Sequence, residues 1–212
     1  MLKLGNILIL GDSYSTFKDY NPEGYAYWYG NEGHINETDV KSAEECWWHL
    51  LEKEVDGKIL LNESHSGATV CNTERPSIPG TSFIIRTDRL IANGFFSENK
   101  IDTILILGGT NDSWIDSPIG KPLYEGFSDE NKLEILPAFA YLLTRLKEVA
   151  PEAKILPLIN CDLKDEVMDG FEEISEKLGI PCLRLKNVSK LNGHPSVEGM
   201  IQIKDQVLEF LK

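Results

Sequence analysis

The chain has 212 residues, of which 42% are hydrophobic and 9% aromatic, and it carries a formal net charge of −13. This length suits one large domain, residues 1–212, that buries roughly 70% of its unfolded surface in a single core, and the apolar content excludes a disordered chain. The negative charge repels phosphate backbones and anionic membranes, so we expect neither a nucleic-acid partner nor a membrane partner.

Met1-Leu2-Lys3-Leu4 leads directly into an apolar run, without the charged leader, apolar core and cleavage site of a signal peptide. No apolar run approaches the roughly 18 residues of a membrane span, so we expect a soluble, cytoplasmic protein of unspecified oligomeric state. Widely spaced cysteines without a C-x-x-C pair predict buried free thiols rather than disulfides or a zinc site. They are Cys46, Cys71, Cys161 and Cys182.

Short apolar runs alternate with segments of helical spacing along the whole chain. The runs predict strands over Ile7–Leu10, Lys58–Leu61, Ile101–Leu107, Ile155–Ile159 and Pro181–Leu185. The helical spacing predicts helices over Ser42–Val55, Ser82–Ala92, Leu133–Val149, Glu166–Leu178 and Val197–Leu211. A capping box, Ser42 with Glu45, opens the first of these helices. The alternation predicts an α/β fold in which a parallel sheet is covered on both faces, a three-layer α/β/α sandwich.

Long polar segments follow the first three predicted strands, over residues 16–41, 62–79 and 108–130. Loops longer than about 15 residues are uncommon in compact domains and are often functional. The carboxyl ends of parallel strands meet at one edge of the sheet, where ligands bind in open α/β folds. We therefore expect the three segments to converge on one site.

The first strand ends at Gly11, and Asp12-Ser13 follows at once. A glycine there lets the chain turn sharply, which exposes Ser13 at the sheet edge as a candidate nucleophile. The alternative is that Asp12 or Ser13 merely caps a helix. The backbone N–H groups of Ser13 and Gly67 and the side-chain Nδ2 of Asn111 would form a three-donor oxyanion hole, each donor lowering the barrier by about 3 kcal/mol.

His194 lies before the last predicted helix and is the candidate general base, because a histidine accepts protons near neutral pH. Alone it would more often be a structural loop histidine. His65 is a rival base, although its loop already has a geometric role beside Gly67.

Four blocks in this order carry a family resemblance. They are Gly11-Asp12-Ser13-Tyr14-Ser15, Gly67 in its polar loop, Gly108-Gly109-Thr110-Asn111-Asp112, and His194-Pro195. Together they resemble the SGNH hydrolases, the GDSL-type esterase and lipase superfamily. The resemblance implies a flavodoxin-like sheet of five parallel strands and an ester hydrolase that needs no metal and no cofactor. It also implies Ser13 as nucleophile, Gly67 and Asn111 as oxyanion donors and His194 as base.

One position departs from the family pattern, because Leu191 stands where an aspartate usually precedes the histidine by three residues. Losing a triad carboxylate can cost up to about 10⁴ in rate when the wrong tautomer results. Possible substitutes are Asn192, a backbone carbonyl within residues 189–192, or a carboxylate from another loop. We expect a Ser-His dyad with backbone help; a weak or degenerate enzyme is the alternative.

Aromatic residues cluster in the first long segment, and Trp114 follows Asn111. The cluster comprises Tyr20, Tyr25, Tyr27, Trp28 and Tyr29. Aromatic faces around a pocket suit sugar rings or acyl groups, although packing of the loop explains about half of them equally well. The candidate substrate-binding residues are Asp12, Tyr14, Trp28 and Trp114, with Asp12 also bonding local amides. His34 with Glu32 and Asp39 has only loose metal spacing, and a solvated loop is the better interpretation.

These observations predict a serine ester hydrolase that forms an acyl-enzyme on Ser13 and acts on a small acyl group, such as acetyl on a carbohydrate. A thioesterase or lysophospholipase for longer acyl chains would use the same residues. A non-catalytic carbohydrate-binding protein is the rival from another class. A flavin or nucleotide binder is disfavoured, because no glycine-rich phosphate motif follows the first strand.

Overall fold

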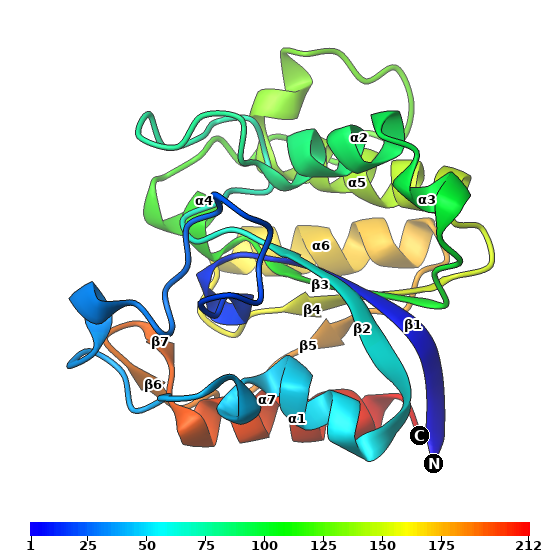
Figure 1. Ribbon diagram of the computed structural model, residues 1–212. Coiled ribbons are helices and arrows are strands. Elements are labelled where there is room, and N and C mark those ends of the chain that lie inside the picture. Colours follow the sequence, from blue (N-terminus) through cyan, green and yellow to red (C-terminus); the bar gives the residue numbers. More distant parts are fainter.

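The computed structural model describes residues 1–212 as a parallel five-stranded sheet between two layers of helices (Figure 1). Its strands are β1 (Leu2–Gly11), β2 (Val55–Ser64), β3 (Thr103–Gly108), β4 (Lys154–Ile159) and β5 (Leu183–Arg184). The strand order β2-β1-β3-β4-β5 is the flavodoxin-like doubly wound order. The predicted three-layer α/β/α sandwich with five parallel strands is confirmed.

Helices cover both faces of the sheet (Figure 1). One face carries α1 (Trp47–Glu54) and α7 (Val197–Phe210), and the opposite layer holds α2 (Phe83–Ala92), α3 (Phe95–Glu98), α5 (Ile135–Val149) and α6 (Asp165–Lys177). A short helix, α4 (Thr110–Trp114), follows β3, and a small hairpin joins β6 (Lys190–Leu191) to β7 (His194–Pro195). No helix is both long and apolar enough to cross a membrane.

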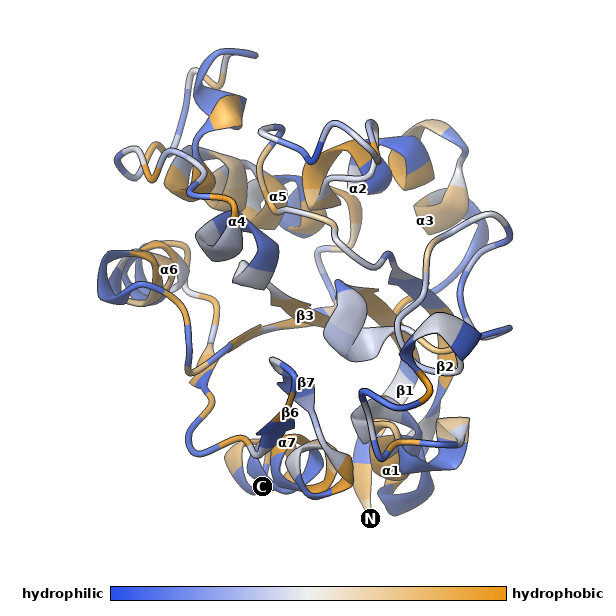
Figure 2. Cartoon of the chain, turned by 90° about the vertical axis from the view of Figure 1, so that its left-hand side faces the viewer, coloured by the Kyte–Doolittle hydropathy of each residue, from blue (hydrophilic) through white to orange (hydrophobic).

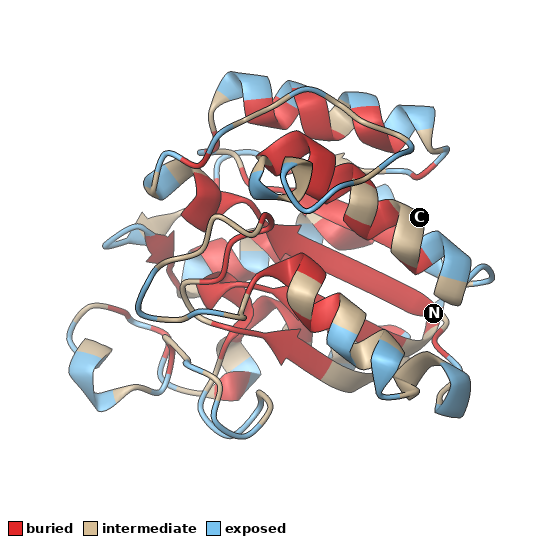
Figure 3. Cartoon of the chain, turned by 90° about the horizontal axis from the view of Figure 1, so that it is seen from above, coloured by how far each residue is buried: buried red, intermediate tan, exposed pale blue.

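The central strands are buried on both faces because their side chains alternate between two cores. Leu8, Leu10, Ile104 and Ile106 pack in the core with α2, α5 and α6, whereas Ile7, Ile9, Leu105 and Leu107 pack in the core with α1 and α7. Figure 3 shows the buried strands as a continuous layer and the helices exposed only on their outer sides. Continuous apolar runs in the sequence are therefore the signature of these strands.

Several boundaries differ from the sequence prediction. The capping box closes a 3₁₀ turn, Ala43–Glu45, and the α-helix starts only at Trp47, because Cys46 between them is extended. The predicted fifth strand, Pro181–Leu185, pairs over only two residues. Helix α4 lies within the segment predicted as a long loop, residues 108–130.

The segments that follow β1, β2 and β3 gather at the carboxyl end of the sheet, together with the β6–β7 hairpin (Figures 1 and 2). The hairpin turns through Asn192 and Gly193, which have positive φ angles of 47° and 78°. Asparagine followed by glycine favours this two-residue turn, because both central residues must adopt left-handed backbone angles. The hairpin brings His194 from near the end of the chain to the edge where β1 ends.

Candidate active site

The turn after β1 places Ser13 at the sheet edge. Asp12 caps a 3₁₀ turn, Ser13–Ser15, by accepting a hydrogen bond at Oδ1 from the N–H of Tyr14 at 3.0 Å. A side chain at Gly11 would lie 2.4 Å from Oγ of Ser64, so only glycine lets β1 pass β2 and turn so closely. Ser13 is 2% exposed.

His194 meets Ser13 from the hairpin. Its Nε2 lies 2.9 Å from Oγ of Ser13, and its Nδ1 lies 3.2 Å from the backbone carbonyl of Asn192. A carbonyl can only accept, so Nδ1 carries the proton and Nε2 is left as the acceptor for the serine hydroxyl. Burial lowers the pKa of His194 from 6.5 to about 4, so the ring is neutral at pH 7.

Leu191, at the position of the usual aspartate, is 43% exposed and pairs with His194 across the hairpin. The Asn192 carbonyl, one residue later, takes the hydrogen bond at Nδ1. This carbonyl is one of the substitutes that the sequence left open. It fixes the tautomer of the histidine but brings no full negative charge to it.

Asn111 comes from α4, directly after β3, and Gly67 from the loop after β2. Nδ2 of Asn111 is buried and has no hydrogen-bond partner, whereas its Oδ1 accepts a bond from Nη2 of Arg75 at 3.3 Å. Gly67 has a φ of 82°, and a side chain there would meet Ile78 at 2.8 Å. Asn111 thus keeps an unpaired amide donor, and Gly67 holds a left-handed backbone angle that residues with a side chain rarely adopt.

Asp112 ties the loops after β2 and β3 together. Its buried carboxylate accepts hydrogen bonds from the N–H groups of Val70 at 2.8 Å and Cys71 at 3.2 Å. In the same way the N–H of His65 donates to the carbonyl of Gly11 at 3.1 Å, which joins the ends of β1 and β2. These bonds fix the relative positions of the segments that carry Ser13, Gly67 and Asn111.

The side chain of Arg86 is fully buried behind the same strand ends. It donates to the carbonyls of Gly11 at 3.0 Å, Glu63 and Thr81. Burial raises the pKa of the neighbouring Asp12 carboxyl to about 7. The buried guanidinium of Arg86 acts in the opposite direction and offsets part of this rise.

The four candidate substrate-binding residues have different surroundings. Asp12 is fully buried, and Tyr14, 2% exposed, donates its hydroxyl to the carbonyl of Gly193 at 2.6 Å. Trp28 stacks on His194, with ring centroids 3.6 Å apart and planes at 6°. Trp114 is 48% exposed and presents its ring at the edge of His194, 5.7 Å between centroids. Trp114 is thus the one of the four with an open surface beside the Ser13–His194 pair.

His65 uses both ring nitrogens within its own loop. Nε2 accepts from the N–H of Ala26 at 3.3 Å, and Nδ1 lies 2.8 Å from the carbonyl of Ser66. Burial lowers the pKa of His65 as well. With both nitrogens bonded to the backbone, the ring joins the aromatic loop to the Gly67 loop, and it is His194 that faces Ser13.

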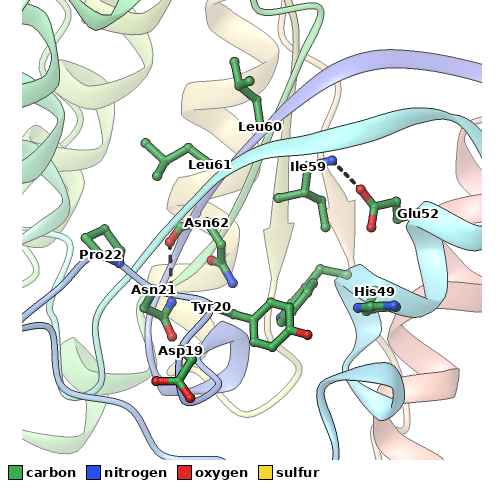
Figure 4. A pocket seen from close by; sticks show the side chains of 11 residues that line it. Asp19, Tyr20, Asn21, Pro22, His49, Glu52, Ile59, Leu60, Leu61 and Asn62 are labelled. Atoms are coloured by element: carbon green, nitrogen blue, oxygen red, sulfur yellow. Dashed lines mark hydrogen bonds between the residues drawn. The ribbon is translucent and has the colours of Figure 1, made fainter.

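A hollow of about 350 Å³ lies elsewhere, on the outer edge of the sheet between β2, α1 and residues 19–22 (Figure 4). Tyr20 and His49 form one side of it, and Ile59 in β2 donates its N–H to Glu52 at 2.7 Å. None of the candidate catalytic residues lines this hollow. The chain also contains no group of three His, Cys, Asp or Glu side chains arranged to hold a metal ion.

Sequence reasoning missed Arg75 and did not single out Asp112 as a loop tie. Arg75 stands in a polar loop, where a lone arginine is usually solvent-exposed, so no local pattern marks it. The Asn192-Gly193 pair was available as a hairpin signal. It indicates a tight turn directly before His194.

Comparisons with known proteins show the family of this chain. The family model described as GDSL-like Lipase/Acylhydrolase matches residues 5–211. A protein from Bacteroides uniformis described as a GDSL-like lipase is 40% identical, with a TM-score of 0.89 over 97% of this chain and 94% of that one. Its counterpart from Bacteroides ovatus is 38% identical, with a TM-score of 0.87 over 98% of both chains.

A family two carbohydrate esterase from Clostridium thermocellum is similar in fold alone, at 16% identity and a TM-score of 0.60 over 98% of this chain and 63% of that one. Among curated proteins no match is found. The family match spans nearly the whole chain and includes every block that carries the serine, glycine, asparagine and histidine. This chain therefore belongs to the GDSL-like lipase and acylhydrolase family of carboxylic ester hydrolases.

Proposed function

We propose that the chain hydrolyses esters of small acyl groups, such as acetyl groups on carbohydrate, through an acyl-enzyme on Ser13. The observation that carries the proposal is the 2.9 Å contact between Oγ of Ser13 and Nε2 of His194. This contact lies within the range for proton transfer from a nucleophile to its base.

In the first half-reaction, Oγ of Ser13 attacks the ester carbonyl carbon while its proton passes to Nε2 of His194. The carbonyl electron pair moves to the oxygen, where the N–H groups of Ser13 and Gly67 and Nδ2 of Asn111 stabilise the charge. The tetrahedral intermediate then expels the alcohol, which takes the proton from Nε2. In the second half-reaction, water attacks the acyl carbonyl carbon while its proton passes to Nε2. The bond from the acyl carbon to Oγ of Ser13 then breaks, Oγ takes the proton from Nε2, and the acid is released.

The preference for a small acyl group has support in the surface of the chain. Twelve hollows indent it; five of them measure about 250 to 540 Å³, and none of these five is lined by Ser13, Asn111 or His194. A long acyl chain requires an apolar channel beside the nucleophile, whereas an acetyl group does not. The exposed ring of Trp114 offers a face for a sugar or an aryl alcohol, and the carbohydrate esterase with the same fold is consistent with the sugar.

The test is hydrolysis of p-nitrophenyl acetate, butyrate and octanoate and of an acetylated sugar by the native chain and by the variants Ser13→Ala and His194→Ala. We expect hydrolysis that declines with acyl length and is abolished by both substitutions. Mass spectrometry after rapid acid quenching should find one acetyl group on Ser13. Hydrolysis that survives Ser13→Ala contradicts the mechanism, and a preference for octanoate favours a thioesterase or lysophospholipase.

A further inference from the structure

Trp28 lies flat against the ring of His194. The two ring centroids are 3.6 Å apart and the planes meet at 6°. His34 stacks on the opposite side of the indole, with centroids 3.7 Å apart and planes at 20°. Both faces of Trp28 are therefore covered by the chain itself, and neither is left for a sugar ring or an acyl group.

The position of Trp28 is tied to the nucleophile turn. Its backbone N–H donates to Oγ1 of Thr16 at 2.9 Å, and the same hydroxyl donates to the carbonyl of Ser13 at 3.0 Å. On the outer side, Nδ1 of His34 lies 2.9 Å from Oε2 of Glu37, which holds that imidazole against the indole. The backbone of Trp28 is thus tied to the turn that carries Ser13, and its indole is held between the rings of His194 and His34.

His194 gains a positive charge when it accepts the proton of Ser13, and its Nδ1 faces only the partial charge of a backbone carbonyl, at 3.2 Å. A cation over an aromatic face is attracted by the quadrupole of the ring, most strongly for tryptophan. A neutral imidazole lacks this charge. The contact is therefore stronger after proton transfer than before it, which is the condition for lowering the barrier.

We propose that Trp28 is a positioning residue that stabilises the imidazolium of His194 during acyl transfer, where other family members use a carboxylate. The inference rests on the proposed function, because the imidazolium forms only when His194 accepts the proton from Oγ of Ser13. The proton binds Nε2 and the charge spreads over the ring, one face of which lies on the indole. The proton leaves with the alcohol in the first half-reaction and returns to Oγ of Ser13 in the second, so the ring is neutral again after each.

The other titratable groups around His194 do not provide this contact. They are His34, Glu37, Lys190, Tyr14 and Tyr29. Glu37 pairs with His34, and Lys190 pairs with Asp162. The two tyrosines donate their hydroxyls to the backbone carbonyls of Gly193 and Pro195, at 2.6 and 2.7 Å.

The test varies the charge distribution of the indole while keeping its shape. Mono-, di- and trifluorotryptophan, introduced at position 28 alone, progressively weaken the negative face of the ring. We expect kcat for p-nitrophenyl acetate to fall about two-fold for each added fluorine, with KM unchanged. The same replacements at Trp48, which packs against Tyr20 and His49 instead, should leave kcat unchanged. A flat response along the Trp28 series overturns the proposal.

A second series uses ordinary substitutions. Trp28→Phe keeps a smaller aromatic face and Trp28→Leu keeps only apolar bulk, so kcat should fall in the order Trp, Phe, Leu, with a loss of about 10-fold or more for Leu. The rate at which a fluorophosphonate labels Ser13 should follow the same order, since labelling needs His194 but no sugar or long acyl chain. Equal rates for Phe and Leu mean that Trp28 acts by packing alone and overturn the proposal.

Ser13→Ala and His194→Ala, measured beside these series, distinguish failure of the proposed ester hydrolysis from failure of the proposed role of Trp28. Hydrolysis that survives either substitution overturns the proposed function and the inference with it. Loss of hydrolysis in both, together with a flat fluorine series, overturns the inference alone.

Discussion

Nη2 of Arg75 donates a hydrogen bond to Oδ1 of Asn111 at 3.3 Å, while Nδ2 of the same amide is buried without a partner. The two ends of an amide are alike in shape but opposite in hydrogen bonding. The guanidinium therefore decides that Asn111 turns its oxygen toward Arg75 and its N–H₂ group away. One side chain from the loop after β2 thus sets the chemistry of another from the segment after β3.

This relationship predicts that Arg75 acts on catalysis through Asn111. Asn111→Ala should lower kcat by about 10²–10³, as for other oxyanion donors, and Arg75→Met by about 10-fold with little change in KM, the scale of one hydrogen bond to a charged group. Arg75→Lys, which keeps a donor, should recover part of the loss. The double variant should be no slower than Asn111→Ala alone, and losses that multiply instead would show that Arg75 acts independently.

The acid limb of the pH profile should follow His194. Only the neutral ring accepts the proton of Ser13, and burial lowers its pKa from 6.5 to about 4. We therefore expect kcat/KM for p-nitrophenyl acetate to stay level as the pH falls through 6.5 and to reach half its plateau near pH 4. Hydrolysis assays quenched at intervals, repeated at pH values from above 6.5 to below 4, measure the midpoint of this limb. A midpoint at or above 6.5 would contradict the buried, neutral histidine.

Leu191→Asp should increase the rate. Leu191 and His194 are opposite each other in the hairpin, and side chains of such a pair lie on the same face about 5 Å apart. A carboxylate there favours the imidazolium, so we expect kcat to rise by several-fold and the midpoint of the acid limb to move to higher pH. Leu191→Asn, similar in shape but uncharged, is the matched control. The same gain in both variants would exclude a charge effect.

Asp12 should make the stability of the chain depend on pH. Its pKa rises from 3.8 to about 7 in the folded chain, chiefly because of burial. Protonation of Asp12 therefore stabilises the folded chain. This stabilisation is fully present below pH 3.8, and it is lost as the pH rises through about 7. The free energy of unfolding of the native chain should therefore fall relative to that of Asp12→Asn between about pH 5 and pH 8.

Urea unfolding of both chains at these two pH values measures the difference. Glu209→Gln is a suitable control, because this carboxylate is exposed on α7 and far along the chain from the turn that carries Ser13. The two chains could instead differ by the same free energy of unfolding at both pH values. That result would contradict a folded-state pKa near 7 for Asp12, because the carboxyl would then have the same charge at both pH values.

Local sequence patterns determined the layers of the fold. Apolar runs such as Ile7–Leu10 and Ile104–Leu107 are long enough for buried strands and are buried on both faces, so their identity did not depend on neighbours. The ends of the strands and helices are not encoded in this way, because they depend on the segments with which each element pairs. β2 extends to Val55 only because it lies along β1, and the 3₁₀ turn at Ala43–Glu45 separates from α1 where Cys46 is extended.

Glycines and short polar blocks after predicted strands drew attention to Ser13, Gly67 and Asn111 in the sequence. His194 stood out by its place before the last helix, and the family resemblance joined the four residues. The contacts between these residues are not local. Trp28 covers His194 across 166 positions, Arg75 orients Asn111 across 36, and the hairpin angle sets the Asn192 carbonyl on Nδ1. The sequence by itself determined which residues stand at the sheet edge, because strand length and turn chemistry are encoded locally. Only the tertiary structure decided what surrounds each of them, because stacking and side-chain hydrogen bonds depend on distances that folding alone creates.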